Sequence, residues 1–172
     1  MNSPKFSAEN IKVLRIIARL NIGGPAIHTI LLSSHLERLG YRTVLVAGQV
    51  DPDEGDMNYL AEAEGVEPII IPRLGRRLLP LSDFAAFLCI LRLLFSRRPQ
   101  IVHTHTAKAG AVGRLAALIY NKAQGARQKA HGFVVRIIPS KRTQESEAQV
   151  TNTKCKVVHT FHGHVLHARK RR

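Results

Sequence analysis

The chain has 172 residues, of which 45% are hydrophobic, and its formal net charge is +14. This length suits one domain of ordinary size, and the apolar content is enough to build a core, which excludes a disordered tail. Only 5% of the residues are aromatic and none is Trp, which argues against the stacking platform of single-stranded nucleic-acid binders. No specific nucleic-acid partner is therefore expected.

Cysteine usage and hydropathy bear on where the protein resides. Cys89 and Cys155 lie far apart in the sequence and indicate neither a disulfide framework nor a metal knuckle. The N-terminus lacks the apolar segment of a secretory signal. The longest apolar run, residues 84–95, contains Arg92 and is shorter than the ~20 residues that span a bilayer. A cytoplasmic protein is predicted, with the inner face of the membrane as a second candidate location.

Apolar periodicity predicts strands that alternate with helices along the chain. In chain order, we expect a strand, a helix and a strand at residues 12–20, 26–39 and 42–48, and a helix and a strand at 57–66 and 69–71. A helix, a strand, a helix and a strand follow at 83–98, 100–105, 107–124 and 156–161, with Ser82 or Asp83 capping the third helix. This alternation indicates an α/β fold, a Rossmann-like doubly wound parallel sheet.

A basic segment does not fit this alternation. Residues 125–154 are polar and lack a periodic core pattern, so we expect a peripheral insertion in which "GFVVRIIP" forms a strand or a hairpin. From Asn121 onward there are twelve Lys and Arg against two Glu, so +10 of the net charge lies in the last 52 residues. Such a run attracts polyanions or an anionic membrane, but it is equally typical of a solvated insertion and tail.

Histidines and glycines follow three of the predicted strands. His103 and His105 come after "QIV", His159 and His162 after "KVV", and the pair Gly23-Gly24 after the first strand. In an open parallel sheet, ligands bind beyond the carboxyl ends of the strands. We therefore expect these three connections to converge on one rim.

The glycine turn "NIGGPAIH" suits a phosphate. Glycine permits positive φ and close approach of a ligand, and Pro25 is favourable in the first turn of a helix. The free N–H groups of that turn bind anions. The GxGxxG fingerprint of dinucleotide-binding proteins is absent. A tight turn without a ligand remains the alternative.

The histidines leave three interpretations open. They could contact a polar ligand, pack or cap structurally, or ligate a metal, because both HxH and HxxHxH allow two imidazoles on one ion. The segment "HTHTAK" supplies no carboxylate, whereas metal-dependent hydrolases need one nearby as base or ligand. We therefore predict polar ligand contacts and no metal.

Five segments resemble, in the same order, the amino-terminal half of a bacterial family 4 glycosyltransferase with the two-domain GT-B architecture. They are "VLRIIARLNIGGPAIHTILLSSHLERLGYRTVLVAG", "EGDM", "IPRLGRRLLPLSD", "RRPQIVHTHTAKAGAVGRLAA" and "VVHTFHGHVL". The resemblance implies a retaining enzyme without a cofactor, acting in polysaccharide biosynthesis. Its substrates would be a nucleoside-diphosphate sugar and a sugar or lipid-linked acceptor. Residues 1–172 would form one acceptor-side domain, incomplete at its C-terminus.

The resemblance also implies roles for individual residues. Gly23 and Gly24 match the glycine loop near the donor diphosphate, and His162 matches the catalytic histidine beside the transferred sugar. The acceptor rim would contain four more residues: His28, His105, Lys108 and His164.

Family members continue beyond "HTFHGHVL" into a second Rossmann domain that carries a Glu-(seven residues)-Glu pair. Without that domain, we expect a fragment, or one half of a two-chain enzyme, that is inactive alone. The alternatives are a non-catalytic module for polyanions or membranes and a metal-dependent hydrolase.

Overall fold

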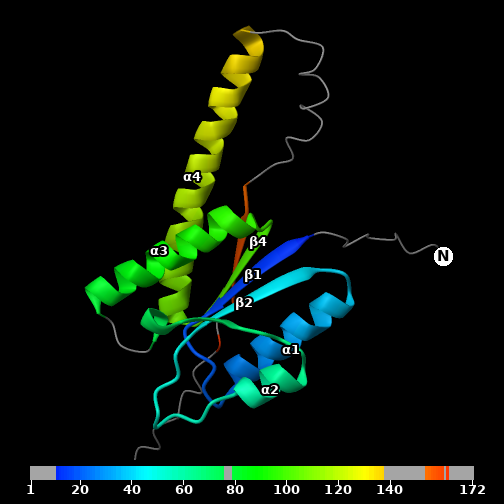
Figure 1. The fold of residues 1–172 in the computed structure, drawn as a ribbon, viewed down its shortest axis with the longest axis vertical. Helices are drawn as coiled ribbons and strands as arrows, with labels where there is room; N and C mark the ends of the chain where they lie inside the picture. Colours follow the sequence, from blue (N-terminus) through cyan, green and yellow to red (C-terminus); the bar gives the residue numbers. More distant parts are fainter. Residues whose placement is uncertain (1–10, 76–78, 138–153, 161, 163–172) are drawn as a thin grey trace, which may run out of the picture.

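The computed structural model describes residues 11–75, 79–137, 154–160 and 162, with only the backbone described for 128–137. Its centre is a five-stranded parallel sheet in the order β3-β2-β1-β4-β5 (Figure 1). The strands are β1 Lys12–Ile17, β2 Arg42–Gly48, β3 Ile69–Ile71, β4 Ile101–His105 and β5 Lys156–Thr160. All five predicted strands are confirmed, and the first ends three residues earlier than expected.

Helices cover both faces of this sheet. Helices α1 (Gly24–Arg38) and α2 (Asn58–Ala63) lie on one face (Figure 1). On the other face lie the short 3-10 helix η1 (Pro72–Leu74), α3 (Pro80–Arg97) and α4 (Ala107–Ile137). The predicted Rossmann-like doubly wound fold is confirmed.

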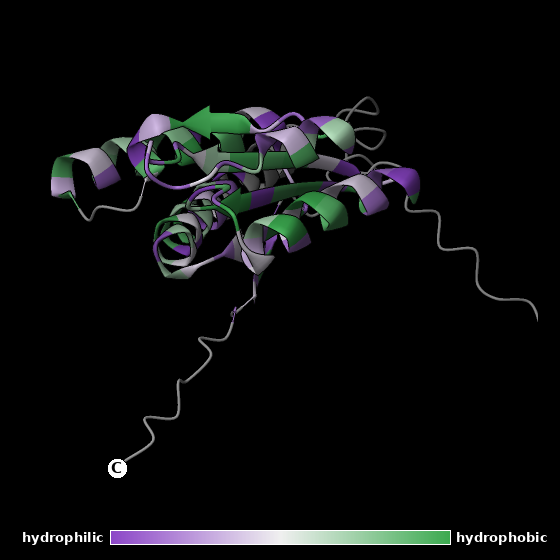
Figure 2. Ribbon diagram, turned by 90° about the horizontal axis from the view of Figure 1, so that it is seen from below, coloured by the Kyte–Doolittle hydropathy of each residue, from purple (hydrophilic) through white to green (hydrophobic). Residues whose placement is uncertain are grey.

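Two apolar layers form the core, one on each side of the sheet, and Figure 2 shows the hydrophobic strands enclosed between the helices. Leu14 and Ile16 of β1 face the layer under α3 and α4, and Ile17 faces the layer under α1 and α2. Because both faces are buried, β1 reads as a nearly continuous apolar run, as parallel strands do. Arg15 is the exception in that run.

The start of α3 corrects the predicted cap. The residue before the helix is Leu79, which makes no side-chain capping bond, and Pro80 occupies the first turn. Proline suits this position because its fixed φ is already helical and its missing N–H would have no partner there. Ser82 instead donates its hydroxyl to the carbonyl oxygen of Arg73 at 3.2 Å.

Helix α4 corrects the prediction of a strand or hairpin in "GFVVRIIP". The helix continues from Ala107 through Ile137, so the residues "GFVVRI" are helical. No proline interrupts the chain between these ends, and an isolated glycine such as Gly125 weakens a helix by only about 1 kcal/mol relative to Ala. Residues 138–153 of the expected insertion lie outside the described part of the chain.

Strand β5 follows the long segment that begins with α4, and the side chain of Asn121 fixes where this strand starts. The amide of Asn121 on α4 accepts a hydrogen bond from the backbone N–H of Cys155 at 2.8 Å and donates to its carbonyl oxygen at 2.9 Å. Asn121 thus replaces a missing strand neighbour at the beginning of β5. Cys155 is buried and Cys89 is exposed, and both are free thiols.

Candidate functional site

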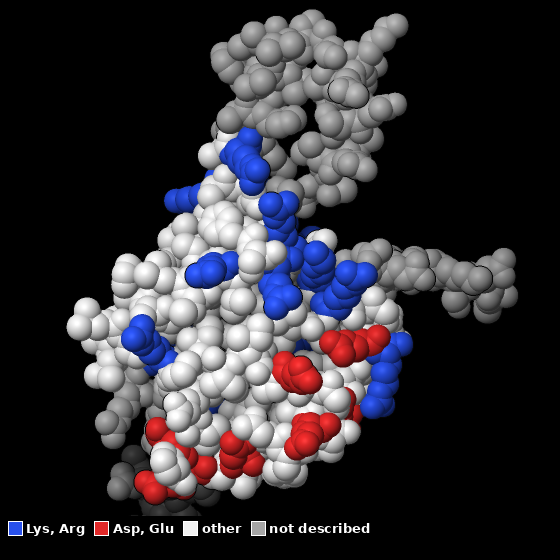
Figure 3. Space-filling view, viewed as in Figure 1, with Lys and Arg blue, Asp and Glu red and all other residues white. Residues whose placement is uncertain are grey.

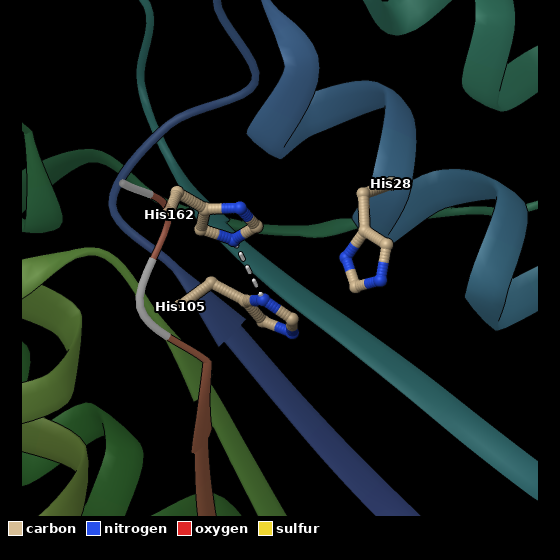
Figure 4. A group of neighbouring side chains, drawn as sticks. All are labelled: His28, His105 and His162. Carbon is tan, nitrogen blue, oxygen red and sulfur yellow. Dashed lines mark hydrogen bonds between the residues drawn. The ribbon is translucent and has the colours of Figure 1, made fainter. Parts of the chain in front are cut away.

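Three histidines from distant parts of the sequence meet at the carboxyl end of the sheet (Figure 4). His28 lies on α1, His105 ends β4, and His162 follows β5. Nδ1 of His105 and Nε2 of His162 are 3.2 Å apart. The ring of His28 is edge-on to both, with centroid distances of 5.8 Å to His105 and 5.6 Å to His162. The predicted convergence of three connections is therefore found for these side chains.

Burial differs sharply within this cluster, which we call the histidine triad (His28, His105 and His162). His105 is fully buried, His162 is half-buried and His28 is exposed. Burial, with the neighbouring charges of His103, His162, Arg15 and His28, lowers the pKa of His105 to about 2. Burial also lowers the pKa of His162. At neutral pH both imidazoles are uncharged and offer one N–H donor and one acceptor nitrogen.

His103 supports the triad from within β4. Its Nε2 is 2.7 Å from the hydroxyl of Thr160 on β5, and its ring lies 4.2 Å from that of His105. Burial, followed by the charge of Arg15, lowers its pKa to about 4. His103 therefore lies within the sheet as the neutral neighbour of His105, not in the loop that follows.

A buried cation lies beside these imidazoles. Arg15 of β1 is the strand partner of His103 and is only 1% exposed. Its Nε and Nη1 have no hydrogen-bond partner among the described residues. Burial lowers its pKa to about 10, so the guanidinium stays charged at neutral pH. The sheet face below the triad is therefore electropositive.

The glycine turn has the predicted positive φ at one of its two glycines. Gly23 has a positive φ (φ 158°, ψ 165°), a backbone conformation that other residues rarely adopt, whereas Gly24 does not, because it already begins α1. Pro25 lies in the first turn, as predicted. A Cβ added at Gly24 would meet no atom within 4 Å. Gly24 thus borders open space at the positive end of the α1 dipole.

A second loop holds this turn in place. The backbone N–H of Ile22 donates to the carbonyl of Gly55 at 2.9 Å. Arg19 forms a two-pronged ion pair with Glu54, in which Nη2 and Oε1 are 3.0 Å apart. Both side chains are about one-fifth exposed. Charge-assisted bidentate pairs of this kind fix geometry well, so the loop around residues 51–57 positions the glycine turn.

The side chains of two other residues predicted at this rim, His159 and Lys108, make their contacts away from the triad. His159 lies within β5, where its Nδ1 is 2.8 Å from the hydroxyl of Thr104, and its ring packs closely on Gly110 of α4. Lys108 forms a 2.6 Å ion pair with Asp83 of α3, and its side chain is 9% exposed. Both contacts belong to the α3–α4 side of the sheet. His164 lies outside the described residues.

A sequence model of Glycosyltransferase Family 4 matches residues 22–134. The chain belongs to glycosyltransferase family 4. The family 4 match includes the glycine turn, His28, His105 and Lys108, and it ends before His162. The resemblance seen in the sequence motifs is confirmed by this match.

Two solved structures are similar to the family 4 chain at low sequence identity. One is a protein described as a UDP-N-acetylglucosamine 2-epimerase from Listeria monocytogenes, with 18% identity, a TM-score of 0.48 and 64% of this chain covered. The other is MurG from Acinetobacter baumannii, with 18% identity, a TM-score of 0.48 and 63% covered. The family 4 chain spans only 28% and 32% of their lengths. No curated protein matches it in sequence.

Sequence reasoning missed three components of this site in the family 4 chain. Arg15 lies inside the strand that apolar periodicity predicts for residues 12–20, and a charged residue in a run buried on both faces is itself a signal. The Arg19–Glu54 pair joins two loops, and no local pattern indicates it. The bond between His103 and Thr160 depends on strand register, which becomes visible only when β4 and β5 are paired.

Proposed function

We propose that this chain is the acceptor-side domain of a retaining glycosyltransferase that uses a nucleoside-diphosphate sugar. The observation that carries the proposal is that the imidazoles of the histidine triad lie together beside the amino-terminal turns of α1, in a chain that belongs to family 4. Neutral imidazoles give oriented hydrogen bonds to sugar hydroxyls without a fixed charge. A helix N-terminus and the buried Arg15 favour an anion such as a diphosphate.

In this proposal each part of the site has one role. The turn at Gly23 and Gly24 lets the diphosphate approach the backbone at the start of α1. His162, the catalytic residue, contacts the transferred sugar and steadies the positive charge that develops at its anomeric carbon. The bond from that carbon to the diphosphate oxygen breaks, and the bond to the acceptor oxygen forms on the same face. The acceptor proton passes to the departing phosphate oxygen.

His28, His105, Lys108 and His164 belong to the acceptor side in this scheme. His105 is buried and acts through its contact with His162, so it is a positioning residue. Base and ribose of the donor would be held by a second Rossmann domain, in the same protein or on a separate chain. Correct positioning of reactants contributes ~7–11 kcal/mol to lowering a barrier. We therefore expect no transfer by residues 1–172 alone.

Pyrophosphate titration followed by NMR tests the donor-phosphate site. A helix N-terminus favours an exposed anion by only ~0.3–1 kcal/mol, so binding should be weak, near the millimolar range that corresponds to ~4 kcal/mol. Amides of residues 22–27 should shift, and Gly24→Val should abolish the shifts by filling the open space. Shifts confined to residues 125–154 or 169–172 would instead place the anion on the basic segments and contradict the proposal.

Sugar transfer is tested with a panel of nucleoside-diphosphate sugars and a lipid-phosphate or polysaccharide acceptor. The 172-residue chain alone should give no turnover, whereas a combination with a family 4 donor domain should restore it. In the restored system, His162→Ala should abolish transfer and His35→Ala should not. Turnover by the chain alone that disappears in His162→Ala would overturn the requirement for a second domain.

An exposed apolar stripe on α3 favours a second role, attachment to an anionic membrane. Four large side chains along this helix are 43–88% exposed, with Arg92 exposed among them: Leu81, Phe84, Leu88 and Phe95. In Figure 3 Lys and Arg gather around α4 and the adjoining end of the sheet, and Asp and Glu gather where α1 and α2 lie. None of the described helices is both long and apolar enough to cross a bilayer, so attachment would be peripheral.

Co-sedimentation with vesicles tests this attachment. Binding to anionic vesicles should exceed binding to neutral ones and fall with salt, because each basic residue near the surface contributes about 1 kcal/mol at best. Leu81→Asp should weaken binding. Leu39→Asp is a matched control, because Leu39 is also exposed but follows α1 on the other face of the sheet. Equal binding to both vesicle types would contradict the electrostatic account.

A further inference from the structure

We propose that the histidine triad is a binding site for a divalent transition-metal ion such as Zn²⁺. One ring nitrogen from each of His28, His105 and His162 lies within 4.8 Å of those of the other two. Three imidazoles form a complete protein ligand set in open zinc sites, where a fourth position stays free for water or an anion. This inference does not depend on the proposed sugar transfer.

The distances within the triad suit such an ion. Zinc binds imidazole nitrogen at about 2.0–2.1 Å, so two ligands of a tetrahedral ion lie roughly 3.3 Å apart. The pair His105 Nδ1 and His162 Nε2 already has this spacing, at 3.2 Å. His28 is the most exposed of the three, and its ring faces the other two from α1 (Figure 4). The three ligand nitrogens lie within 4.8 Å of one another, so His28 has to move closer for one ion to bind all three, and its exposure leaves it room to do so.

An unsatisfied nitrogen on the ring of His105 indicates a missing ligand or water at the triad. Nε2 of His105 is buried and has no hydrogen-bond partner among the described residues. A buried polar atom without a partner costs about 1–3 kcal/mol, and native proteins place such atoms where a ligand, a water or a chemical task explains them. With Nδ1 directed at His162, the free Nε2 shows that the buried side of the triad is completed by a ligand or a water that the described residues do not supply.

The histidine triad is not the HxH pair of His103 and His105, for which the sequence argued against a metal. The HxH pair of β4 does not act together, because the Nε2 of His103 lies at the hydroxyl of Thr160. The third ligand comes from α1 instead. A carboxylate is needed as the base of a metal-dependent hydrolase, but binding of the ion needs only the three imidazoles.

The positive charges around the triad favour an anion as the fourth ligand of the metal. Arg15 lies next to His103 in the sheet, and the positive end of α1 is close to His28. Both oppose a bare cation and favour an anion bound to the metal. We therefore expect metal affinity to be moderate and a small anion such as azide to bind readily at the fourth position.

Titration of the full 172-residue chain with Co²⁺, monitored by the visible absorption of the ion, tests the site. One equivalent should bind with the intense bands of a tetrahedral centre, azide should shift these bands, and Zn²⁺ should displace Co²⁺. His28→Ala and His162→Ala should each weaken binding by about tenfold or more. His35→Ala is the matched control, because His35 is exposed on the same helix and bonds only locally, to the carbonyl of Leu31.

His28 and His162, the two less buried members of the triad, carry this test, because replacing the buried His105 could disturb folding. Circular dichroism of each variant confirms that the fold is intact. Wild-type affinity in folded His28→Ala and His162→Ala would place the metal on other histidines and overturn the proposal. Absence of Co²⁺ and Zn²⁺ binding by the wild type would overturn it as well. Since no sugar donor is present, neither result bears on glycosyl transfer.

Discussion

Arg15 and His103 are direct partners across β1 and β4, with the guanidinium buried on the same sheet face as the imidazole. Burial is the main reason that His103 titrates at about 4, and the charge of Arg15 is the next. Burial is also the main cause of the lowered pKa of His105, followed by the charges of His103, His162 and Arg15. A buried cation and two neutral imidazoles are thus electrostatically coupled beneath the candidate site.

Replacing Arg15 with Met tests what this buried charge does. The guanidinium is nearly unexposed, and two of its nitrogens lack partners. Substituting a hydrophobic residue for a buried ion is often neutral or stabilising, by about 1–4 kcal/mol. We expect Arg15→Met to be at least as stable as the wild type in urea denaturation and to have a raised His103 pKa by NMR. Destabilisation by more than about 1 kcal/mol would show that Arg15 has a favourable partner.

Stability should fall in mild acid because His103 and His105 are neutral when folded. In the unfolded chain both should titrate near 6.5, whereas the folded values are about 4 and about 2. Below pH 6.5 the unfolded state binds protons that the folded state does not, so the free energy of unfolding decreases as the pH falls. For His103 alone the decrease is of the order of 3 kcal/mol by pH 4.

The measurement is urea denaturation at intervals between pH 7.5 and 4. His103→Gln, which cannot become charged, should lose less stability over this range than the wild type. His35→Gln should behave as the wild type, because His35 is exposed. If His103→Gln left the dependence of the unfolding free energy on pH unchanged, this would contradict the assignment of the acid destabilisation to His103 and His105.

Substitution by Ala should strongly destabilise the fold at Gly48 and change its stability little at Gly24. A Cβ at Gly48 would overlap the carbonyl oxygen of Ala18 and lie 2.7 Å from the carbonyl carbon of Leu74, both backbone atoms. Gly48→Ala should therefore destabilise the fold by about 3 kcal/mol or more. A Cβ at Gly24 would meet no atom within 4 Å. The helix preference of Ala offsets the cost of a helical residue before Pro25, so stability should change by less than about 1 kcal/mol. Thermal unfolding of both variants compares them directly.

The sequence was sufficient for the fold because local signals and topology agree. Strand β2 was predicted with its observed bounds, since an apolar run is preceded by the turn at Gly40 and followed by a polar loop. The helix α4 was predicted too short because Gly125 and the basic composition resemble a helix end. Propensity alone does not distinguish a helix that ends there from one that continues.

The site was predictable only in part for a physical reason. Parallel topology places strand ends on one rim, so the approach of His105 and His162 follows from the order of elements. The direction of each side chain depends on the register and on the pleat, in which successive residues face opposite sides. His159, three residues before His162, therefore packs against α4, and the ion pair of Lys108 depends on how α3 meets α4.

The Arg19–Glu54 pair should control the candidate phosphate site without deciding the fold. Each side chain is about one-fifth exposed, and the paired atoms Nε of Arg19 and Oε2 of Glu54 are buried, so leaving one partner alone should cost about 1–3 kcal/mol of stability. The pair joins the two loops that shape the glycine turn, and its loss should leave that turn less fixed. We expect Arg19→Met and Glu54→Gln each to weaken pyrophosphate binding several-fold while circular dichroism shows an intact fold. The double variant should bind pyrophosphate no more weakly than either single variant, because both changes remove the same contact.

Arg38→Met is the control. Arg38 pairs with Glu64 at 3.2 Å at the opposite end of α1, so its loss should leave pyrophosphate binding intact. Additive losses of pyrophosphate affinity in the double variant would mean that Arg19 and Glu54 act separately on the anion and not through their ion pair.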